Sequence, residues 1–589
     1  MPLFRWLTAH RPTIHQYIRP PIMATRKNMA STHKQSTSHA LAVPLLSAVR
    51  NDGTEEHISE EELYRYTRHR WVYNEARHIS ERYLKFDLQQ LLKAAVAAIS
   101  SQGARYCTKV LKCKEGLNNK AYLITMDNGA EVFAKLPNPS AGPSFYTTAS
   151  EVATRKFLRD VLKIPTPRVI AWSADRNNPV RAEYILEEKA SGKPLGRLWQ
   201  DWDTLPMKDR INIIEQIVEI ERKLASTKFA KSGCIYFRED IQNSNALVTN
   251  PPLCSSILER FTLGPLVEKE LWRGEKASMD LNRGPYEGPQ DFIKAMAENE
   301  TKFIKAYARP RMNYARSLTK PESPDDMLDL LDRYLQLSPA MVPPQSQDDT
   351  HSPTLWHPDL HLDNVFVDPE SKQITRVIDW QSVAVLPLFY QCGVPTMFRH
   401  QGPVSNDMTI WPKRPENYQS LEPDEKEMID NLIRSECLHK YYLAITHNKN
   451  PRHWAALQLQ DDVRTQPTSI VQNVWKDCDV FFLRRALIRI VNGWEDLCPD
   501  SGPCPVSFNE QEMALYALEE ENRGYVSEIL ALFRKNWRLA PDGSIEAARF
   551  DEVQDELRRM RDAFVGAAEN KEDRLLAEKL WPYQDATDN

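Results

Sequence analysis

The sequence predicts an α+β protein in which a small β-rich unit precedes a much larger, mainly helical one. Between residues 101 and 190, short β-prone runs are separated by turn sequences and interrupted by one helical pattern. From residue 191 to about 545, apolar residues recur mostly at spacings of three and four, which is the period of a helix. A chain of 589 residues is also long enough for more than one packed core.

The first 50 residues differ from the rest in composition and are expected to lie outside the fold. They contain seven basic and no acidic residues, so the remaining chain carries a formal net charge of −12. Basic residues spaced among apolar ones, followed by a hydroxyl-rich stretch at 31–39, are typical of a mitochondrial transit peptide. A basic tail without a targeting role, or a misassigned start upstream of Met23 or Met29, are the alternatives. We therefore expect a mitochondrial protein, in the matrix or associated with the inner membrane.

Composition argues against several other classes of protein. An acidic body without a concentrated basic face is unlike a nucleic-acid-binding protein. The sequence has no run of about 18 apolar residues, which a membrane-spanning helix would need. Its nine cysteines are scattered and form no CxxC pair, so reduced thiols are expected rather than a zinc ribbon or a redox pair.

The elements of the β-rich unit follow from local patterns. A helical extension is expected over 51–100, where Asp87 can cap an amphipathic helix at 86–99. Strands at 121–126 and 131–136 are joined by Asp-Asn-Gly, a strong hairpin signal because Asn and Gly tolerate positive φ. The remaining expected elements are a strand at 107–114, a helix at 150–159 and strands at 168–173 and 182–187.

In the larger unit, helices are expected at 207–225, 292–307 and 327–337, and two short strands at 364–367 and 374–380. A C-terminal helix is expected within 546–589. Its apolar stripe of Val553, Leu557, Met560 and Phe564 has helical spacing and predicts a docking face or core contact rather than a catalytic role.

The strongest chemical signal is the segment His357-Pro-Asp-Leu-His-Leu-Asp-Asn364, followed fifteen residues later by Asp379. Oxygen ligands without cysteine suit a hard cation such as Mg²⁺. In the pattern H-x-D-x₄-N with a later strand-borne Asp, the first Asp orients an attacking hydroxyl, and the Asn and second Asp hold the metal against phosphates. Two alternatives are a zinc site at His357 and His361, and a purely structural acidic hairpin.

Upstream residues match the same chemistry. Lys135 interrupts an apolar strand, and Glu151 lies sixteen residues later on the next helix. A strand lysine paired with a helix glutamate holds the α- and β-phosphates in kinase-like folds. The turn Glu115-Gly-Leu-Asn-Asn119 lies where a phosphate-covering loop is needed, although it has a single glycine.

With these residues in their order, the chain resembles the aminoglycoside phosphotransferase-like branch of the protein-kinase-like fold. More narrowly, it is similar to the fungal "altered inheritance of mitochondria" nine group. The resemblance spans about 70–400 and rests on these motifs: Tyr73-Asn-Glu-Ala-Arg77, Glu115-Gly-Leu-Asn-Asn-Lys-Ala-Tyr122, Phe133-Ala-Lys135, Glu151-Val-Ala-Thr154, His357–Asn364 and Ile378-Asp-Trp-Gln381.

The resemblance implies a bilobal fold, with a nucleotide-binding N-lobe at 101–190 and a catalytic C-lobe at 191–545. It implies Asp359 as catalytic base and a hinge at 184–188 whose backbone meets adenine. Asp363 stands where relatives often have Gly, so it adds either a metal contact or a solvated charge. The other implied site residues are Asn364 and Asp379 as Mg²⁺ ligands, and Lys135, Glu151, Asn118, Glu187 and Lys189 as nucleotide-binding residues.

The expected function is transfer of the γ-phosphate of Mg·ATP to a hydroxyl of an unidentified acceptor, most simply a small molecule. The competing hypothesis is a catalytically inactive nucleotide-binding module that regulates or scaffolds a mitochondrial assembly. The single-glycine loop and the large sections outside the core favour this second reading, whereas the complete set of base, metal ligands, lysine and glutamate favours the enzyme.

Overall fold

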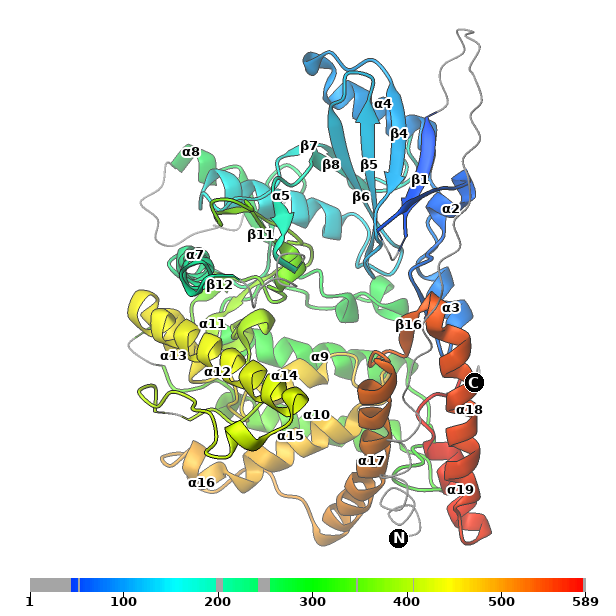
Figure 1. Ribbon diagram of the computed structural model, residues 1–589. Coiled ribbons are helices and arrows are strands. Elements are labelled where there is room, and N and C mark those ends of the chain that lie inside the picture. The colour runs from blue at the N-terminus through cyan, green and yellow to red at the C-terminus, as the bar shows by residue number, and fades with distance from the viewer. Residues whose placement is uncertain are drawn as a thin grey trace.

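The computed structural model describes residues 44–50, 53–196, 205–241, 255–345, 348–405 and 407–585. A sheet-rich N-lobe lies above a larger helical C-lobe, and α5 lies between the two (Figure 1). The expected α+β bilobal architecture is therefore confirmed. The expected transit peptide lies almost entirely outside the described residues.

The N-lobe is built on a seven-stranded sheet with the order β2-β1-β4-β5-β6-β8-β7. The β5–β6 hairpin turns at Gly129, whose φ of 82° is the left-handed conformation that the Asp-Asn-Gly sequence predicts. All neighbouring strands are antiparallel except β1 and β4. The strands are β1 Leu45–Val49, β2 Glu55–His57, β4 Cys107–Lys112, β5 Asn119–Met126, β6 Glu131–Pro137, β7 Val169–Ser173 and β8 Tyr184–Glu188.

Each face of this sheet is covered by a different helix. The α4 helix, Leu88–Ala98, packs its apolar side against Tyr122 and Ile124 of β5. Asp87 caps this helix by accepting from Gln90 N at 3.0 Å, as expected. The α5 helix, Tyr146–Asp160, covers the opposite face together with the C-lobe core. It begins four residues before the expected start at 150.

Two boundaries near the N-terminus differ from expectation. Residues 45–49 were assigned to the presequence, yet they form β1 and pair in parallel with β4. The extension at 51–100 is also not purely helical, because it contains β2 and a further strand, β3 His69–Trp71. β2 pairs with the neighbouring β1, whereas β3 pairs with the distant β16, and neither strand shows a local periodicity. The helices of this extension are α2 Glu60–Tyr64, α3 Glu75–Ser80 and the 3₁₀ turn η2 Ser100–Gln102.

The C-lobe has two apolar cores. One surrounds a three-stranded sheet, β14-β13-β9, and α7. The other lies among α9, α10 and α15. The elements are β9 Lys193–Pro194, α7 Met207–Ala225, β10 Cys234–Phe237, α8 Ser255–Leu258, β11 Phe261–Gly264, α9 Pro289–Tyr307, α10 Pro324–Leu337, β12 Pro353–Leu355, β13 Val365–Val367, β14 Ile374–Val377, β15 Val385–Pro387, α11 Leu388–Gln391, α12 Pro423–Lys449, α13 Pro451–Leu457, α14 Gln466–Val471, α15 Val480–Asn492 and α16 Trp494–Leu497, with 3₁₀ turns η4 Lys269–Leu271, η5 Gly274–Ser278, η6 Ser338–Met341, η7 Leu362–Asn364, η8 Thr396–Phe398 and η9 Tyr418–Ser420.

The C-terminal region runs along one side of the C-lobe and returns to the N-lobe (Figure 1). Its strand β16 pairs with β3 of the N-terminal extension. The four apolar residues of the expected C-terminal stripe are all buried in one cluster, so of the two expected roles, docking face or core contact, the structure shows a core contact. The single helix expected after residue 546 is instead two. The elements are α17 Glu510–Trp537, β16 Ser544–Glu546, η10 Ala547–Arg549, α18 Phe550–Gly566 and α19 Lys571–Leu580.

Two further observations concern the described part of the chain. None of its helices combines the length and the apolar character needed to cross a membrane. All eight cysteines described there are free thiols, as expected from their scattered positions.

Candidate active site

The segment from His357 to Asp379 folds around the β13–β14 hairpin. Val365 and Val377 face each other across this hairpin, and Ile378 N donates to Asn364 O at 2.9 Å. Burial lowers the pKa of His357, so its ring is neutral at pH 7 and Nε2–H donates to Ile378 O at 3.0 Å. His357 therefore fastens the loop before β13 to the residue that precedes Asp379.

This geometry bears on the zinc alternative. The His357 ring is buried, and its Nε2–H donates to the carbonyl of Ile378. His361 Nδ1 accepts from Asp363 N at 3.2 Å. Across the described ranges, no three or more His, Cys, Asp or Glu side chains gather closely enough to hold a metal ion. The two histidines serve the loop conformation, and the zinc alternative finds no support.

Asp359 and Asn364 lie in the same loop but in different environments. The Asp359 side chain is 68% exposed and lies 3.7 Å from His361 Nε2. Asn364 is buried, and its Nδ2 donates to Asp359 O at 2.9 Å. Its Oδ1 is an oxygen acceptor of the kind that can bind a cation. Asp363 is exposed beside Gly196, where a Cβ would come within 2.3 Å of Asp363 Oδ1.

Asp379 sits at the end of β14 with a φ of +63°, in the left-handed region that a non-glycine residue adopts at a cost of about 1–2 kcal/mol. Burial raises the pKa of its carboxyl, but the Lys135 ammonium, 3.3 Å from Oδ1, outweighs burial and lowers the pKa overall. The carboxylate is therefore ionised at pH 7. In this backbone conformation the carboxylate lies against the Lys135 ammonium.

Lys135 joins the two lobes at this point. Its Nζ lies 2.9 and 3.0 Å from the carboxylate oxygens of Glu151 on α5, in addition to the Asp379 contact. The sequence expectation of a strand lysine paired with a helix glutamate is thus met in the geometry. A cation held between one carboxylate from each lobe is suited to hold phosphate oxygens.

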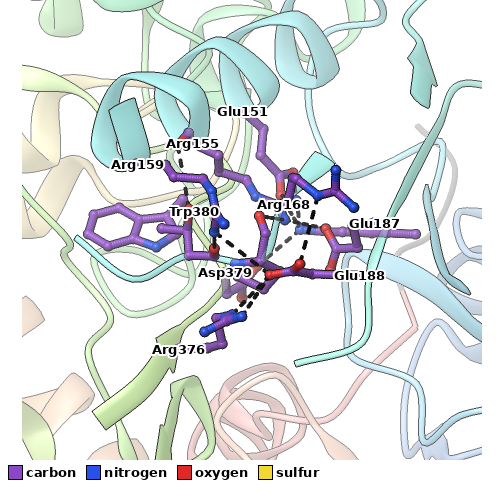
Figure 2. Close-up of polar contacts among 12 residues, drawn as sticks. Glu151, Arg155, Arg159, Arg168, Glu187, Glu188, Arg376, Asp379 and Trp380 are labelled. Atoms are coloured by element: carbon purple, nitrogen blue, oxygen red, sulfur yellow. Dashed lines mark hydrogen bonds and ion pairs between the residues drawn. The ribbon is translucent and has the colours of Figure 1, made fainter. Parts of the chain in front are cut away.

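Two further charged residues, Arg155 and Glu187, continue the Lys135–Glu151 pair into the N-lobe. Figure 2 shows them with Glu151. Arg155, one helical turn after Glu151, lies 3.5 Å from Glu151 Oε1 and is ion-paired with Glu187 of β8. Its Nη2 also donates to Pro167 O at 3.0 Å. All four charged side chains are buried. Burial of unpaired charge is costly, so this alternation of positive and negative charges is what allows the set to exist.

A second charged group surrounds Glu188, the last residue of β8 (Figure 2). Arg376 of β14 donates to Glu188 Oε1 through Nε and Nη2 at 3.1 and 2.9 Å. Arg159 of α5 and Arg168 approach the same carboxylate at 3.7 and 3.9 Å. Because Arg376 belongs to the C-lobe and the others to the N-lobe, Glu188 ties the lobes together at the hinge.

The remaining predicted nucleotide-binding residues are placed unevenly. Asn118 is exposed in the β4–β5 loop, and its carbonyl accepts from Asn138 N at 2.8 Å. The Glu187 carboxylate is ion-paired with Arg155, and its backbone lies in β8 between Phe133 of β6 and Val169 of β7. Lys189 pairs with Glu131 at 2.7 Å near the start of β6. The structure brings Lys135, Glu151, Glu187 and Asp379 into one network, but it does not bring Lys189 into it.

Sequence reasoning missed three contributors. Arg155 has a readable signal, because it follows Glu151 by four residues on the same helix face. Arg376 and the amide pair between Asn119 and Gln381 had none. In that pair, Asn119 Nδ2 donates to Gln381 Oε1 at 2.9 Å and Gln381 Nε2 donates to Asn119 Oδ1 at 3.1 Å. It connects the start of β5, directly after the β4–β5 loop, to the residues after Asp379.

Fold and site together define a bilobal, kinase-like phosphotransferase. A model of the family described as "Phosphotransferase enzyme family" (APH) matches residues 109–393, which include every candidate site residue. A subtelomeric hrmA-associated cluster protein of Aspergillus fumigatus is 32% identical over 518 residues, covering 82% of this chain and 98% of that protein. The chain belongs to the APH phosphotransferase family.

More distant likenesses were also found. The mitochondrial "altered inheritance of mitochondria protein 9" of Eremothecium gossypii is 25% identical over 450 residues, which is 71% of each chain. A putative aminoglycoside phosphotransferase of Ralstonia eutropha has 15% identity and a TM-score of 0.29, covering 70% of this chain and 98% of its own. An amicoumacin kinase in complex with AMP-PNP and Ca²⁺ has 12% identity and a TM-score of 0.29, covering 68% of this chain and 94% of its own.

Proposed function

We propose that the protein transfers the γ-phosphate of Mg·ATP to a hydroxyl group of a small-molecule acceptor. The observation that carries this proposal is Lys135, whose ammonium lies between Glu151 at 2.9 Å and Asp379 at 3.3 Å. A lysine in that position contacts phosphate oxygens once a nucleotide enters, and the two carboxylates keep it charged and aimed.

The residues present fit a magnesium ion. Asn364 and Asp379 offer amide and carboxylate oxygens, which are hard donors, and their positions are fixed by the Asn364–Ile378 and Asn364–Asp359 hydrogen bonds. Two protein ligands are enough, because Mg²⁺ completes its shell with water and phosphate oxygens. When bound, the ion would neutralise charge that develops on the transferred phosphoryl group.

Asp359 is the residue proposed to face the acceptor. Its exposed carboxylate is free to accept the proton of an incoming hydroxyl and to orient that hydroxyl in line with the phosphorus atom. Its backbone carbonyl is held by Asn364, so the base and the metal ligand keep a fixed relation. Most of the rate acceleration would come from this positioning and from charge neutralisation.

Adenine is proposed to bind the backbone of the segment that follows β8. The Glu187 side chain supports this segment through Arg155, and Lys189 supports it through Glu131. Asn118 is proposed to contact the phosphates through the loop it belongs to. The mitochondrial names of relatives such as the Eremothecium gossypii protein, together with the basic N-terminal composition, support a mitochondrial location.

The proposal is tested with purified wild-type protein, Asp359→Asn and Asp379→Ala. We expect ADP formation against a panel of hydroxyl-bearing metabolites, with Asp359→Asn slower by about 10²- to 10⁴-fold at unchanged nucleotide affinity. Asp379→Ala should lose Mg²⁺-dependent nucleotide binding, measured by calorimetry with AMP-PNP. Lys109→Met, which changes a half-buried lysine of β4 that pairs with Glu55 away from Lys135, is the matched control and should behave as wild type.

Two outcomes would contradict this proposal. An unchanged transfer rate in Asp359→Asn would remove the assignment of the base. Nucleotide binding at millimolar concentration without turnover on any acceptor would instead favour the second candidate, a nucleotide-binding scaffold. The single glycine in the loop over the phosphates is the observation that keeps that candidate under test.

A further inference from the structure

The loop between β4 and β5 is fixed by one buried carboxylate. Glu115 is 2% exposed and accepts from Lys120 Nζ at 2.8 Å. Its second oxygen lies 3.1 Å from Lys112 Nζ and accepts from the backbone amide of Thr67 at 3.1 Å. Thr67 belongs to the N-terminal extension, so the loop is held from outside the nucleotide-binding sheet.

Further hydrogen bonds join the extension to the loop and to the two strands beside it. Arg68 Nη1 donates to Glu115 O at 2.9 Å. Lys112 donates to the carbonyls of Glu62 and Arg65, and Lys120 donates to the carbonyl of Arg65 at 3.0 Å. Two ammonium groups, one carboxylate and several carbonyls thus form a buried polar cluster, which we name the Glu115 anchor.

The same stretch of the extension is bound to the C-terminal region. Directly after the anchor, β3 pairs antiparallel with β16, with Trp71 opposite Ser544. Ala547 N donates to Arg68 O at 3.3 Å, and Val72 N donates to Gly543 O at 3.0 Å. We call the paired strands β3 and β16 the strap. Figure 1 shows β16 and α18 beside α3, at the level between the lobes.

The strap reaches the C-lobe core through α17. Glu519 of this helix is fully buried and contacts Arg484 Nη1 of α15 at 3.1 Å. Its other oxygen accepts from Asn313 Nδ2 at 2.8 Å. A continuous set of contacts therefore leads from the β4–β5 loop to the C-lobe without passing through the hinge at Glu188.

We propose that the strap is a second connection between the lobes, and that Glu115 is a positioning residue that holds the β4–β5 loop over the nucleotide phosphates. This inference rests on the proposed function. The loop has one glycine, Gly116, and a Cβ added there would meet nothing within 4 Å. The loop therefore needs no backbone conformation that only glycine can adopt. The contacts of the Glu115 anchor hold it instead. A loop ordered in advance lowers the entropic cost of binding the phosphates.

The test measures hydrogen exchange of the amides at 113–118 in the full-length protein. Arg68→Met removes one loop contact at an exposed position, so the variant should fold, and Ala547→Pro removes the amide that donates to Arg68 O. We expect both to speed loop exchange several-fold. The control is Arg77→Met, an exposed arginine of the same extension that pairs within its own helix, and it should leave exchange unchanged.

A second measurement addresses the nucleotide. The Kd for Mg·AMP-PNP should rise several-fold in Arg68→Met and Ala547→Pro, with Glu115→Gln giving a larger rise if it folds. Loop exchange at the wild-type rate in both Arg68→Met and Ala547→Pro would overturn the strap. Faster exchange with an unchanged Kd would overturn the loop's role at the phosphates. Failure of the wild-type protein itself to bind nucleotide would overturn the proposed function, while the exchange data would still decide whether the strap holds the loop.

Discussion

Two buried lysines lie on opposite faces of the N-lobe sheet and differ in what surrounds them. Lys135 of β6 faces Glu151 of α5 and Asp379, and it is opposite Ala121 in the strand pairing. Lys120 is the neighbour of Ala121 on β5, so it points to the other face, toward the N-terminal extension. One strand pairing thus carries a candidate catalytic lysine and a structural one.

Their charge balance explains the difference. Burial alone lowers the pKa of Lys135, but Glu151 and Asp379 outweigh burial and raise it overall. Burial lowers the pKa of Lys120 to about 8, because Glu115 is shared with Lys112 and compensates only in part. A lysine beside two carboxylates stays charged and can bind an anionic ligand. A lysine that shares its one carboxylate with a second lysine makes hydrogen bonds, but its buried charge is only partly compensated. Burial by itself therefore does not identify a functional lysine.

The largest expected effect comes from breaking, at Arg155, the buried charge network that runs from Lys135 through Glu151 to Glu187. Arg155→Met leaves Glu187 buried without its cation and removes the donor to Pro167 O. We expect a loss of about 3–5 kcal/mol in the free energy of unfolding, measured by urea denaturation. The double variant Arg155→Met/Glu187→Leu should recover much of that loss, because no uncompensated charge then remains at this position. A cost below about 1 kcal/mol for the single variant would show that the network is not the balanced set described.

An intermediate effect is expected on the other face, and it depends on pH. The folded-state pKa of Lys120 is about 8 against an ordinary value of 10.5, so between these values the unfolded state binds more protons. Stability contributed at this position should therefore rise as pH increases from about 8 to 10.5, by about 2–3 kcal/mol. The measurement is the difference in unfolding free energy between wild type and Lys120→Met across that range. A flat difference for Lys120→Met would contradict the lowered pKa.

The smallest effect is expected at the hinge. Glu188→Gln weakens contacts with arginines that are 23–55% exposed, so solvent screening limits the loss to about 1 kcal/mol or less. The loss should shrink further at high salt. Glu219→Gln, which breaks an exposed pair with Arg222 on α7, is the matched control. A loss above about 2 kcal/mol in the free energy of unfolding would mean that the contacts of Glu188, rather than the buried network of Arg155, dominate the attachment of the lobes.

Much of the fold and part of the site could be predicted from sequence because the signals are local. The β5–β6 hairpin follows from Asp-Asn-Gly, and the α4 start follows from Asp87. The pairing of Lys135 with Glu151 follows from strand and helix patterns sixteen residues apart. The loop that carries Asp359 and Asn364 follows from residue types and spacing. The roles of these residues in catalysis stay predictions.

What the sequence could not predict depends on distant pairing. β3 and β16 have three residues each, which is too short for periodicity to show, and they find each other across almost the whole chain. β1 was hidden in a basic prefix whose composition resembles a transit peptide. Arg376 meets Glu188 only because two lobes come together. Each of these features is set by tertiary contacts between segments whose local sequences are unremarkable.

The pairing of β3 with β16 has a consequence for how the protein is made. Trp71 and its partner Asp542 are 471 residues apart. At about 5–20 residues per second, the ribosome needs roughly 25 to 95 s after β3 to produce β16. For that time the nascent N-lobe can close its own sheet and form the Glu115 anchor, but β3 has no partner strand. The pairing can form only after residues 544–546 have been translated, so a chain that stops earlier folds without this connection between the N-terminal extension and the C-terminal region.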